Sequence, residues 1–214
     1  EPSDINSHPH CDYKGKISVV HNGIIENYLK LREMLESNGY EFLSETDTEV
    51  IPNLIDYFYT GNLLDAVMKA VSRMEGSYAI GVLSSKEPDK LVAVRKDSPL
   101  IVGVGKEEAF IASDIPAILN YTREVYLLED KEFVVISNQG VKIFNEFSEL
   151  IHKDIYKVPW NAGSVIKGDY EDYMLKEIYE QPKAIRDTMA SRIIVGEDVS
   201  LGEINITKEV KLKI

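Results

Sequence analysis

Two short groups of polar residues have the types and spacing to do chemistry. The first is His21-Asn22-Gly23, which follows an apolar run and precedes a run of helical spacing. The side-chain amide of Asn22 and the backbone N–H of Gly23 could both donate to one oxygen, as an oxyanion hole for acyl transfer requires. A plain Asn-Gly turn that caps a helix explains the same residues, and a motif this short does not decide between the two interpretations.

The second group is the run Ser44-Glu45-Thr46-Asp47-Thr48-Glu49, which is dense in oxygen acceptors. Asp47 could hold the ammonium group of a substrate. It could equally cap a helix, with its carboxylate stabilised by the helix dipole. No recognised loop spacing supports metal binding by these carboxylates, so we expect no metal site here.

The segment His8-Pro9-His10-Cys11 places three soft ligands close together. Zinc sites usually need four ligands, and the only other histidines are His21 and His152. We therefore favour a structural or polar-network role for His8 and His10. Cys11 makes a weak nucleophile candidate, because no strand-to-helix elbow surrounds it.

Composition excludes several classes of protein. The 214 residues carry 24 Lys and Arg against 36 Asp and Glu, a net charge of −12. So acidic a chain is a poor partner for nucleic acid or anionic lipid, whose binding depends on neutralised phosphates. No apolar run approaches the roughly 18 residues that span a bilayer. The single cysteine permits no internal disulfide, and the chain shows no secretory signal, so we expect a cytoplasmic protein.

The elements that must position these residues follow from periodicity. A strand over residues 16–20 leads into a turn at 21–23. Helical spacing predicts helices over residues 25–37, 50–58 and 63–74. Ser113-Asp114 would cap a short helix through residue 119, and a last helix over 170–179 would be interrupted at Gln181-Pro182 and resume over 185–193. Strand-like runs lie at residues 41–43, 78–83, 91–94, 100–104, 109–112, 126–128, 133–136 and 141–144. Asn138-Gln139-Gly140 reads as a hairpin turn. Helices grouped before and between antiparallel-looking strands indicate an α+β fold of two stacked sheets covered by helices.

Taken together, several segments resemble the glutaminase domain of glutamine–fructose-6-phosphate aminotransferases. The matching segments are Glu1-Pro2-Ser3, His8-Pro9-His10, residues 20–27, residues 44–50, Gly76-Ser77-Tyr78-Ala79, Ser98-Pro99-Leu100, residues 110–114 and residues 173–182. The resemblance covers residues 1–193. Residues 194–214 would then be a linker toward a sugar isomerase domain that this sequence does not contain. Amidotransferases of purine and asparagine synthesis share the Asn-Gly feature and rank second.

The resemblance implies an N-terminal-nucleophile fold, a four-layer αββα sandwich. It implies that the side-chain amide of glutamine is hydrolysed and that the ammonia converts fructose 6-phosphate to glucosamine 6-phosphate, with no cofactor. The Asn22 side chain and the Gly23 N–H match the oxyanion hole of the family, and Asp47 matches the carboxylate that holds the glutamine ammonium. The full-length protein would be a homodimer.

The sequence departs from the family at its beginning. The first residue is Glu1, whereas the family begins with a nucleophilic Cys, and Cys11 does not match that position. The first strand, the first helix and the Arg-containing loop of the family would lie upstream of Glu1. We therefore expect this chain alone to be inactive. An alternative of another class is a non-catalytic binding module on the same scaffold; the presence of Asn22, Gly23 and Asp47 favours an active site.

Overall fold

A computed structural model describes residues 3–159, 170–190, 193–194 and 198–199. The chain divides into two compact units, Glu1–Ala162 and Gly163–Ile214, and each is described by itself. The expected domain boundary after residue 193 stays a prediction. Most of the expected linker, residues 195–197 and 200–214, lies outside the described residues.

The first unit is built on a seven-stranded antiparallel sheet in the order β1-β2-β3-β4-β8-β9-β10. Its strands are β1 (His10–Cys11), β2 (Ile17–Ile25), β3 (Gly76–Ser84), β4 (Lys90–Lys96), β8 (Phe133–Ser137), β9 (Gly140–Phe144) and β10 (Leu150–Ile151). A 3-10 turn, η1 (Asp4–Asn6), precedes them. Strands β8 and β9 pair Ser137 with Gly140, so only two residues form the connection and the expected hairpin is confirmed.

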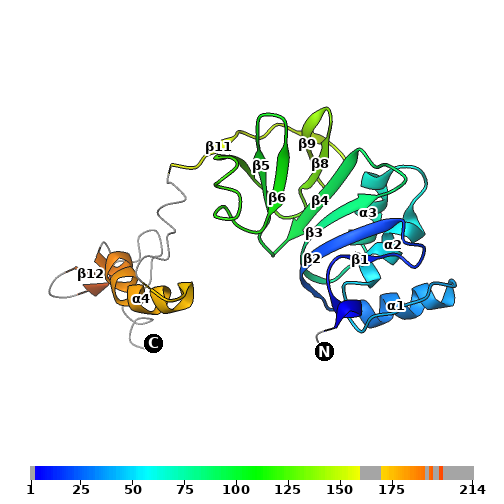
Figure 1. Cartoon of the computed structure of the whole chain (residues 1–214), viewed down its shortest axis with the longest axis horizontal. Helices are drawn as coiled ribbons and strands as arrows, with labels where there is room; N and C mark the ends of the chain where they lie inside the picture. Colours follow the sequence, from blue (N-terminus) through cyan, green and yellow to red (C-terminus); the bar gives the residue numbers. More distant parts are fainter. Residues whose placement is uncertain (1–2, 160–169, 191–192, 195–197, 200–214) are drawn as a thin grey trace. The chain divides into compact units, whose positions relative to one another are not determined.

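Helices α1 (Tyr28–Ser37), α2 (Val50–Phe58) and α3 (Leu63–Val71) cover one face of this sheet (Figure 1). The apolar stripes of all three helices pack with the inward residues of β2, β3, β4 and β8 into one large core. Leu35, Leu54 and Val67 are fully buried there, one from each helix. Burial of such side chains contributes about 1.5–3 kcal/mol each, so this core is the main source of stability on the helical side.

A second antiparallel sheet, in the order β11-β7-β5-β6, packs on the opposite face. Its strands are β5 (Ile101–Val104), β6 (Ala109–Ala112), β7 (Glu124–Leu127) and β11 (Tyr156–Lys157). Val102 of this sheet packs with Ala79, Ala93 and Val134 of the first sheet. The two stacked sheets and the helical layer fit the expected α+β class.

The outer face of the second sheet is covered by residues 113–120, which form bends and turns rather than the expected helix. Ile118 and Leu119 from this segment pack on Ile101 and Val125. Asp114 accepts a hydrogen bond from the N–H of Ala117 (3.1 Å), as the cap interpretation requires, but the chain continues in turns. The prediction of a helix there was wrong, although Ile118 and Leu119 are buried.

The largest difference from expectation concerns His21-Asn22-Gly23. These residues form no turn but lie inside β2, where Asn22 pairs with Ala79 and Gly23 with Tyr78 of β3. Gly23 has φ +134°, and a Cβ atom there would come within 2.1 Å of the Ser77 carbonyl oxygen. The glycine thus allows a distorted strand to stay paired where a turn signal predicted its end.

Two further predictions near the site were wrong. Residues 41–43 form no strand, and helix α1 begins at Tyr28 rather than at residue 25 because β2 extends that far. Elements predicted from strong periodicity, such as α2, α3 and β3 to β6, lie within a few residues of their expected bounds.

The second unit contains helix α4 (Tyr173–Ala190) and the short hairpin β12 (Ile193–Ile194) with β13 (Asp198–Val199). The sequence predicted an interruption at Gln181-Pro182, but Pro182 lies inside one continuous helix. A proline removes one N–H of the helical ladder.

The close approach of Gly23 to Ser77 predicts that a side chain at position 23 destabilises the folded chain. We expect Gly23→Ala to lower the free energy of unfolding by roughly 2–4 kcal/mol, because the new methyl group would have to displace the backbone of β3. Gly15→Ala is the matched control, since Gly15 also has positive φ (+65°) but has no atom within 4 Å of the added Cβ. That substitution should cost only about 1 kcal/mol. Urea denaturation of the chain measures both; equal losses would contradict the close approach in β2.

Candidate functional site

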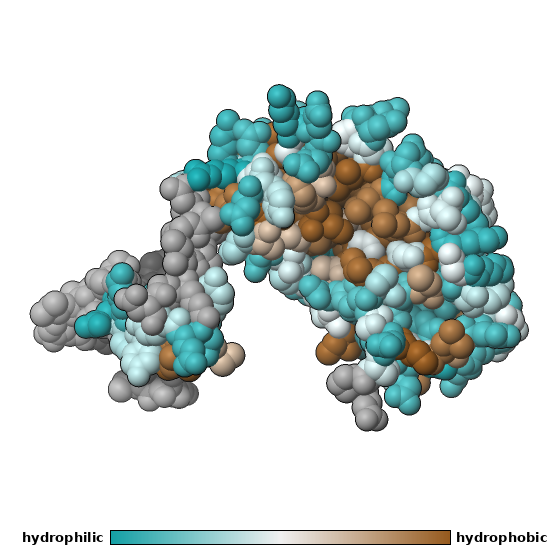
Figure 2. Space-filling model, in the orientation of Figure 1, coloured by the Kyte–Doolittle hydropathy of each residue, from teal (hydrophilic) through white to brown (hydrophobic). Residues whose placement is uncertain are grey.

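The two faces of β2 have different surroundings: one packs on the helices, and the other lines a cavity. Ile17, Val19 and Ile25 point toward the helices and are fully buried. Because alternate residues of a strand face opposite sides, Asn22 faces the second sheet. There it lines a cavity of about 220 Å³. The other lining residues are His8, Val20, His21, Ala79, Ile80, Gly81, Pro99, Leu100, Ile111, Ala112 and Ser113. In Figure 2 hydrophobic residues gather in the hollow over the middle of the first sheet.

The backbone of β2 supplies a second donor beside Asn22. The N–H of Ile25 points away from β3, since it donates to Asp47 Oδ2 at 2.7 Å. N–H groups of alternate strand residues share one edge, so the N–H of Gly23 belongs to this same edge. The amide of Asn22 and the N–H of Gly23 thus come from adjacent residues on the open edge and the open face of one strand.

Asp47 is not a helix cap. The N-cap of α2 is Glu49, which makes no side-chain cap hydrogen bond, and Asp47 instead reaches back to the backbone of β2. One carboxylate oxygen accepts from Ile25, and Oδ1 has no hydrogen bond within the described residues. Asp47 is half-buried, so this second oxygen remains open to a donor from a ligand. All three predicted site residues therefore meet one strand, because Asn22 and Gly23 lie in β2 and Asp47 accepts from its Ile25 N–H. Of the three, only Asn22 lines the cavity.

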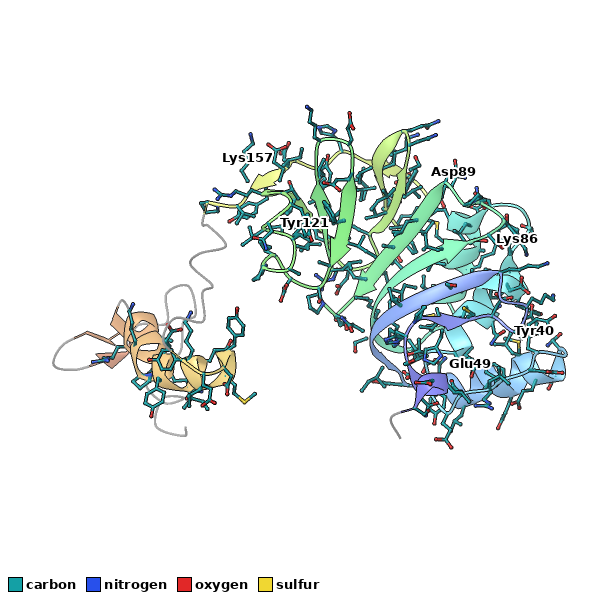
Figure 3. All side chains as sticks on the ribbon, in the orientation of Figure 1. Tyr40, Glu49, Lys86, Asp89, Tyr121 and Lys157 are labelled. Carbon is teal, nitrogen blue, oxygen red and sulfur yellow. The ribbon has the colours of Figure 1, made fainter. Side chains whose placement is uncertain are left out.

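Residues 43–49, the acidic loop, carry Asp47. Glu49 fixes the beginning of the loop, because its buried carboxylate accepts from the N–H groups of Leu43 (2.8 Å) and Ser44 (2.6 Å). Arg32 of α1 donates to the Ser44 carbonyl at 3.1 Å. Figure 3 labels Glu49 at the start of α2, close to η1 and β1. The loop is thus held by side-chain hydrogen bonds, although it has no regular secondary structure.

Sequence reasoning missed His21 as a site residue. Its ring is buried, and Nδ1 lies 2.9 Å from the Thr48 hydroxyl, whereas Nε2 has no hydrogen-bond partner in the described part of the chain. An unsatisfied buried polar atom costs about 1–3 kcal/mol. Burial lowers the pKa of His21, and the Asp47 carboxylate only partly offsets this, so the ring stays neutral near neutral pH. The alternation of the strand was the available signal: His21 is two residues after Val19 and four after Ile17, so all three side chains lie on the buried face.

His8 and His10 lie beside the candidate site, and His8 also lines the cavity. His10 is buried, its Nε2 lies 3.2 Å from the Thr46 hydroxyl, and burial lowers its pKa. The rings of His8 and His10 meet edge to face at 5.4 Å. Cys11 is exposed, with Sγ 3.2 Å from the Ser18 hydroxyl, and is not among the residues that line the cavity.

The described residues provide no metal-binding cluster near the site. No group of three or more His, Cys, Asp and Glu side chains could hold a metal ion among the residues that the structure describes. Within the same part of the chain, none of the helices has the length and apolar character needed to cross a membrane.

Solved structures share this fold. The chain superimposes with a TM-score of 0.59 on glutamine phosphoribosylpyrophosphate amidotransferase from B. subtilis, at 22% identity, over 69% of this chain and 33% of that one. An allosteric regulatory enzyme of purine biosynthesis gives a TM-score of 0.55 at 23% identity, over 61% of this chain and 28% of that chain. At these identities the likeness concerns the fold, which is that of N-terminal-nucleophile amidotransferases, as expected.

Curated relatives are much more similar in sequence. The chain is 65% identical over 209 residues to glutamine–fructose-6-phosphate aminotransferase (isomerizing) of Clostridium acetobutylicum, covering 98% of this chain and 34% of that protein. The protein of the same name from Clostridium tetani is 64% identical over 214 residues, which cover 100% of this chain and 35% of that protein. The chain thus spans about a third of the length of these relatives.

A family model described as "Glutamine amidotransferase domain" matches residues 3–120, more than half of the chain. This range contains the cavity, the donor strand β2 and the acidic loop. The chain therefore belongs to the family of glutamine amidotransferase domains.

Proposed function

We propose that the chain binds glutamine between Asp47 and the Asn22-Gly23 donors and takes part in hydrolysis of its side-chain amide. One observation carries the proposal. The carboxylate of Asp47 is hydrogen-bonded to the N–H of Ile25, on the strand that carries both donors. A negative group for an ammonium and a pair of donors for a developing oxyanion therefore share one rigid support.

The dimensions suit an amino acid with a side-chain amide. Asn22 and Ile25 are three residues apart on β2, which at about 3.3 Å per residue is roughly 10 Å. In glutamine the ammonium nitrogen and the amide oxygen are five bonds apart, about 6 Å when extended. Adding a hydrogen bond of about 2.9 Å at each end gives roughly 12 Å. The two spans are comparable, so one glutamine can contact both ends of the site.

The reaction proposed is nucleophilic amide hydrolysis. A thiol attacks the amide carbon, a C–S bond forms, and negative charge develops on the oxygen, where Asn22 and Gly23 donate. When the tetrahedral intermediate collapses the C–N bond breaks and ammonia leaves, and water then hydrolyses the thioester. Cys11 does not line the cavity, so it is not the attacking thiol of the proposal. The family resemblance implies a thiol on a segment that precedes Glu1.

The complete protein is proposed to be a glutamine–fructose-6-phosphate aminotransferase, supported by relatives of that name at 64–66% identity. Ammonia from glutamine would convert fructose 6-phosphate to glucosamine 6-phosphate in a sugar isomerase domain that follows residues 194–214. We propose that it acts in the cytoplasm as a homodimer and without a cofactor.

The test is to assay the complete protein that contains this chain with glutamine and fructose 6-phosphate. We expect one glutamate and one glucosamine 6-phosphate per glutamine consumed, because the released ammonia becomes the amino group of the sugar. If glutamine hydrolysis required an acceptor other than fructose 6-phosphate, the protein would be a different amidotransferase. Absence of any glutamine hydrolysis, with a correctly folded protein, would favour the non-catalytic binding module.

Asn22 should act once charge has developed on the amide oxygen. In the complete protein we expect Asn22→Ala to lower kcat for glutamine hydrolysis by about 10²–10³ while KM stays similar, because the lost donor acts in the transition state. Asn22→Asp keeps the size but places a negative acceptor beside the oxyanion, so its kcat should be lower still. Steady-state ammonia release measures both. A change confined to KM would contradict the oxyanion role.

Asp47 should act already in the ground state. We expect Asp47→Asn to raise KM for glutamine about 10- to 100-fold and to change kcat much less, because it removes the charge that binds the ammonium. Glu45→Gln is the matched control, since it removes the same charge two residues away from an exposed position. It should stay within about 2-fold of the wild type. If both variants raise KM equally, the effect is general electrostatics and not a contact of Asp47.

A further inference from the structure

The segment His21–Ile25 of β2 has a strand neighbour along only one edge in the described part of the chain. Strand β3 pairs with the whole of β2. Strand β1 pairs with Ser18 and Val19 only, so its support ends before the donors begin. An unpaired strand edge is free to shift unless other groups hold it.

Two hydrogen bonds from the acidic loop hold this segment, which among the described residues has no strand on its second edge. Asp47 Oδ2 accepts from the N–H of Ile25 at 2.7 Å, and the Thr48 hydroxyl lies 2.9 Å from His21 Nδ1. They fall on either side of the Asn22-Gly23 donors. Consecutive residues of the loop therefore fix both ends of the donor segment.

Packing alone does not explain a histidine at position 21. The neighbouring helix-facing positions of β2 hold Ile17, Val19 and Ile25, all fully buried. His21 is buried among them, and its Nε2 has no partner within the described residues. An apolar side chain would avoid that cost. What the imidazole adds beyond packing is the hydrogen bond between its Nδ1 and the Thr48 hydroxyl.

We propose that His21 and Thr48 are positioning residues that set the distance between the Asn22-Gly23 donors and the Asp47 carboxylate, a role that rests on the proposed function. Neither side chain needs to touch the substrate for this. Their hydrogen bond holds the donor segment against the loop residue adjacent to Asp47. Without this hydrogen bond, the distance between the Asn22-Gly23 donors and Asp47 varies. A glutamine bound through its ammonium group then has its amide displaced from the donors.

The first test compares two isosteric substitutions in the complete protein. Thr48→Val removes the hydroxyl that meets the donor strand. Thr46→Val, two residues away in the same loop, removes a hydroxyl that meets Ser44 and His10 of β1 instead. We expect Thr48→Val to lower kcat/KM for glutamine about 10-fold and Thr46→Val less than about 2-fold. Equal losses would overturn the proposal.

A double-mutant cycle separates positioning from general stabilisation. In the Asp47→Asn background the ammonium anchor is already lost, so adding Thr48→Val should lower kcat/KM less than about 2-fold further. A loss of about 10-fold in both backgrounds would overturn the positioning role alone. An unchanged KM in the Asp47→Asn single variant would instead overturn the proposed function, and this proposal with it.

Variants at position 21 keep the test decisive if Thr48→Val fails to fold. The side-chain nitrogen of asparagine can occupy the place of Nδ1 of histidine, whereas leucine offers no polar atom. We expect His21→Asn to retain most of the wild-type kcat/KM and His21→Leu to match the loss of Thr48→Val. Thermal melts of each variant serve as the folding control. An active His21→Leu would overturn the proposal.

Discussion

The site depends on the hydrogen bond from the N–H of Ile25 to the carboxylate of Asp47. Among the described residues the N–H of Ile25 has no strand partner on this edge of β2, and a backbone N–H without a hydrogen bond is unfavourable when it is removed from water. A carboxylate is a strong acceptor for it, so the hydrogen bond stabilises the contact between loop and strand. This bond brings a loop 22 residues away in sequence to the donor strand. It leaves the second oxygen of the carboxylate without a hydrogen bond among the described residues.

The layered fold makes such an arrangement possible because β2 has two different faces. Its helix-facing side chains join the large core and anchor the strand. The opposite face meets the second sheet through a cavity rather than through close packing, and Asn22 points there. One strand thus combines the stability of a buried core with an exposed amide side chain at a cavity, an arrangement that the proposed donor role requires.

Sequence patterns predicted the parts of this structure that depend on local signals. The periodic helices, the Asn138-Gln139 hairpin and most strands follow from spacing and turn chemistry. The site residues named from the sequence stay a prediction, and the local structure expected for them was wrong. Asn22-Gly23 is a turn signal, yet pairing with β3 overrides it. Asp47 resembles a cap, yet its partner is a strand N–H far away in sequence. His21 was missed because its role depends on a contact with Thr48 that no local pattern contains.

Gly23 shows why fold and site cannot be separated at this strand. The close approach of the Ser77 carbonyl leaves no room for a side chain, and φ +134° is a conformation that other residues rarely adopt. The same conformation keeps β2 paired with β3 while its N–H lies on the open edge beside Asn22. A side chain at this position would therefore push the strand away from β3 and misdirect the donor at once. The glycine is required by the pairing of the sheet, and the position of the donor follows from that requirement.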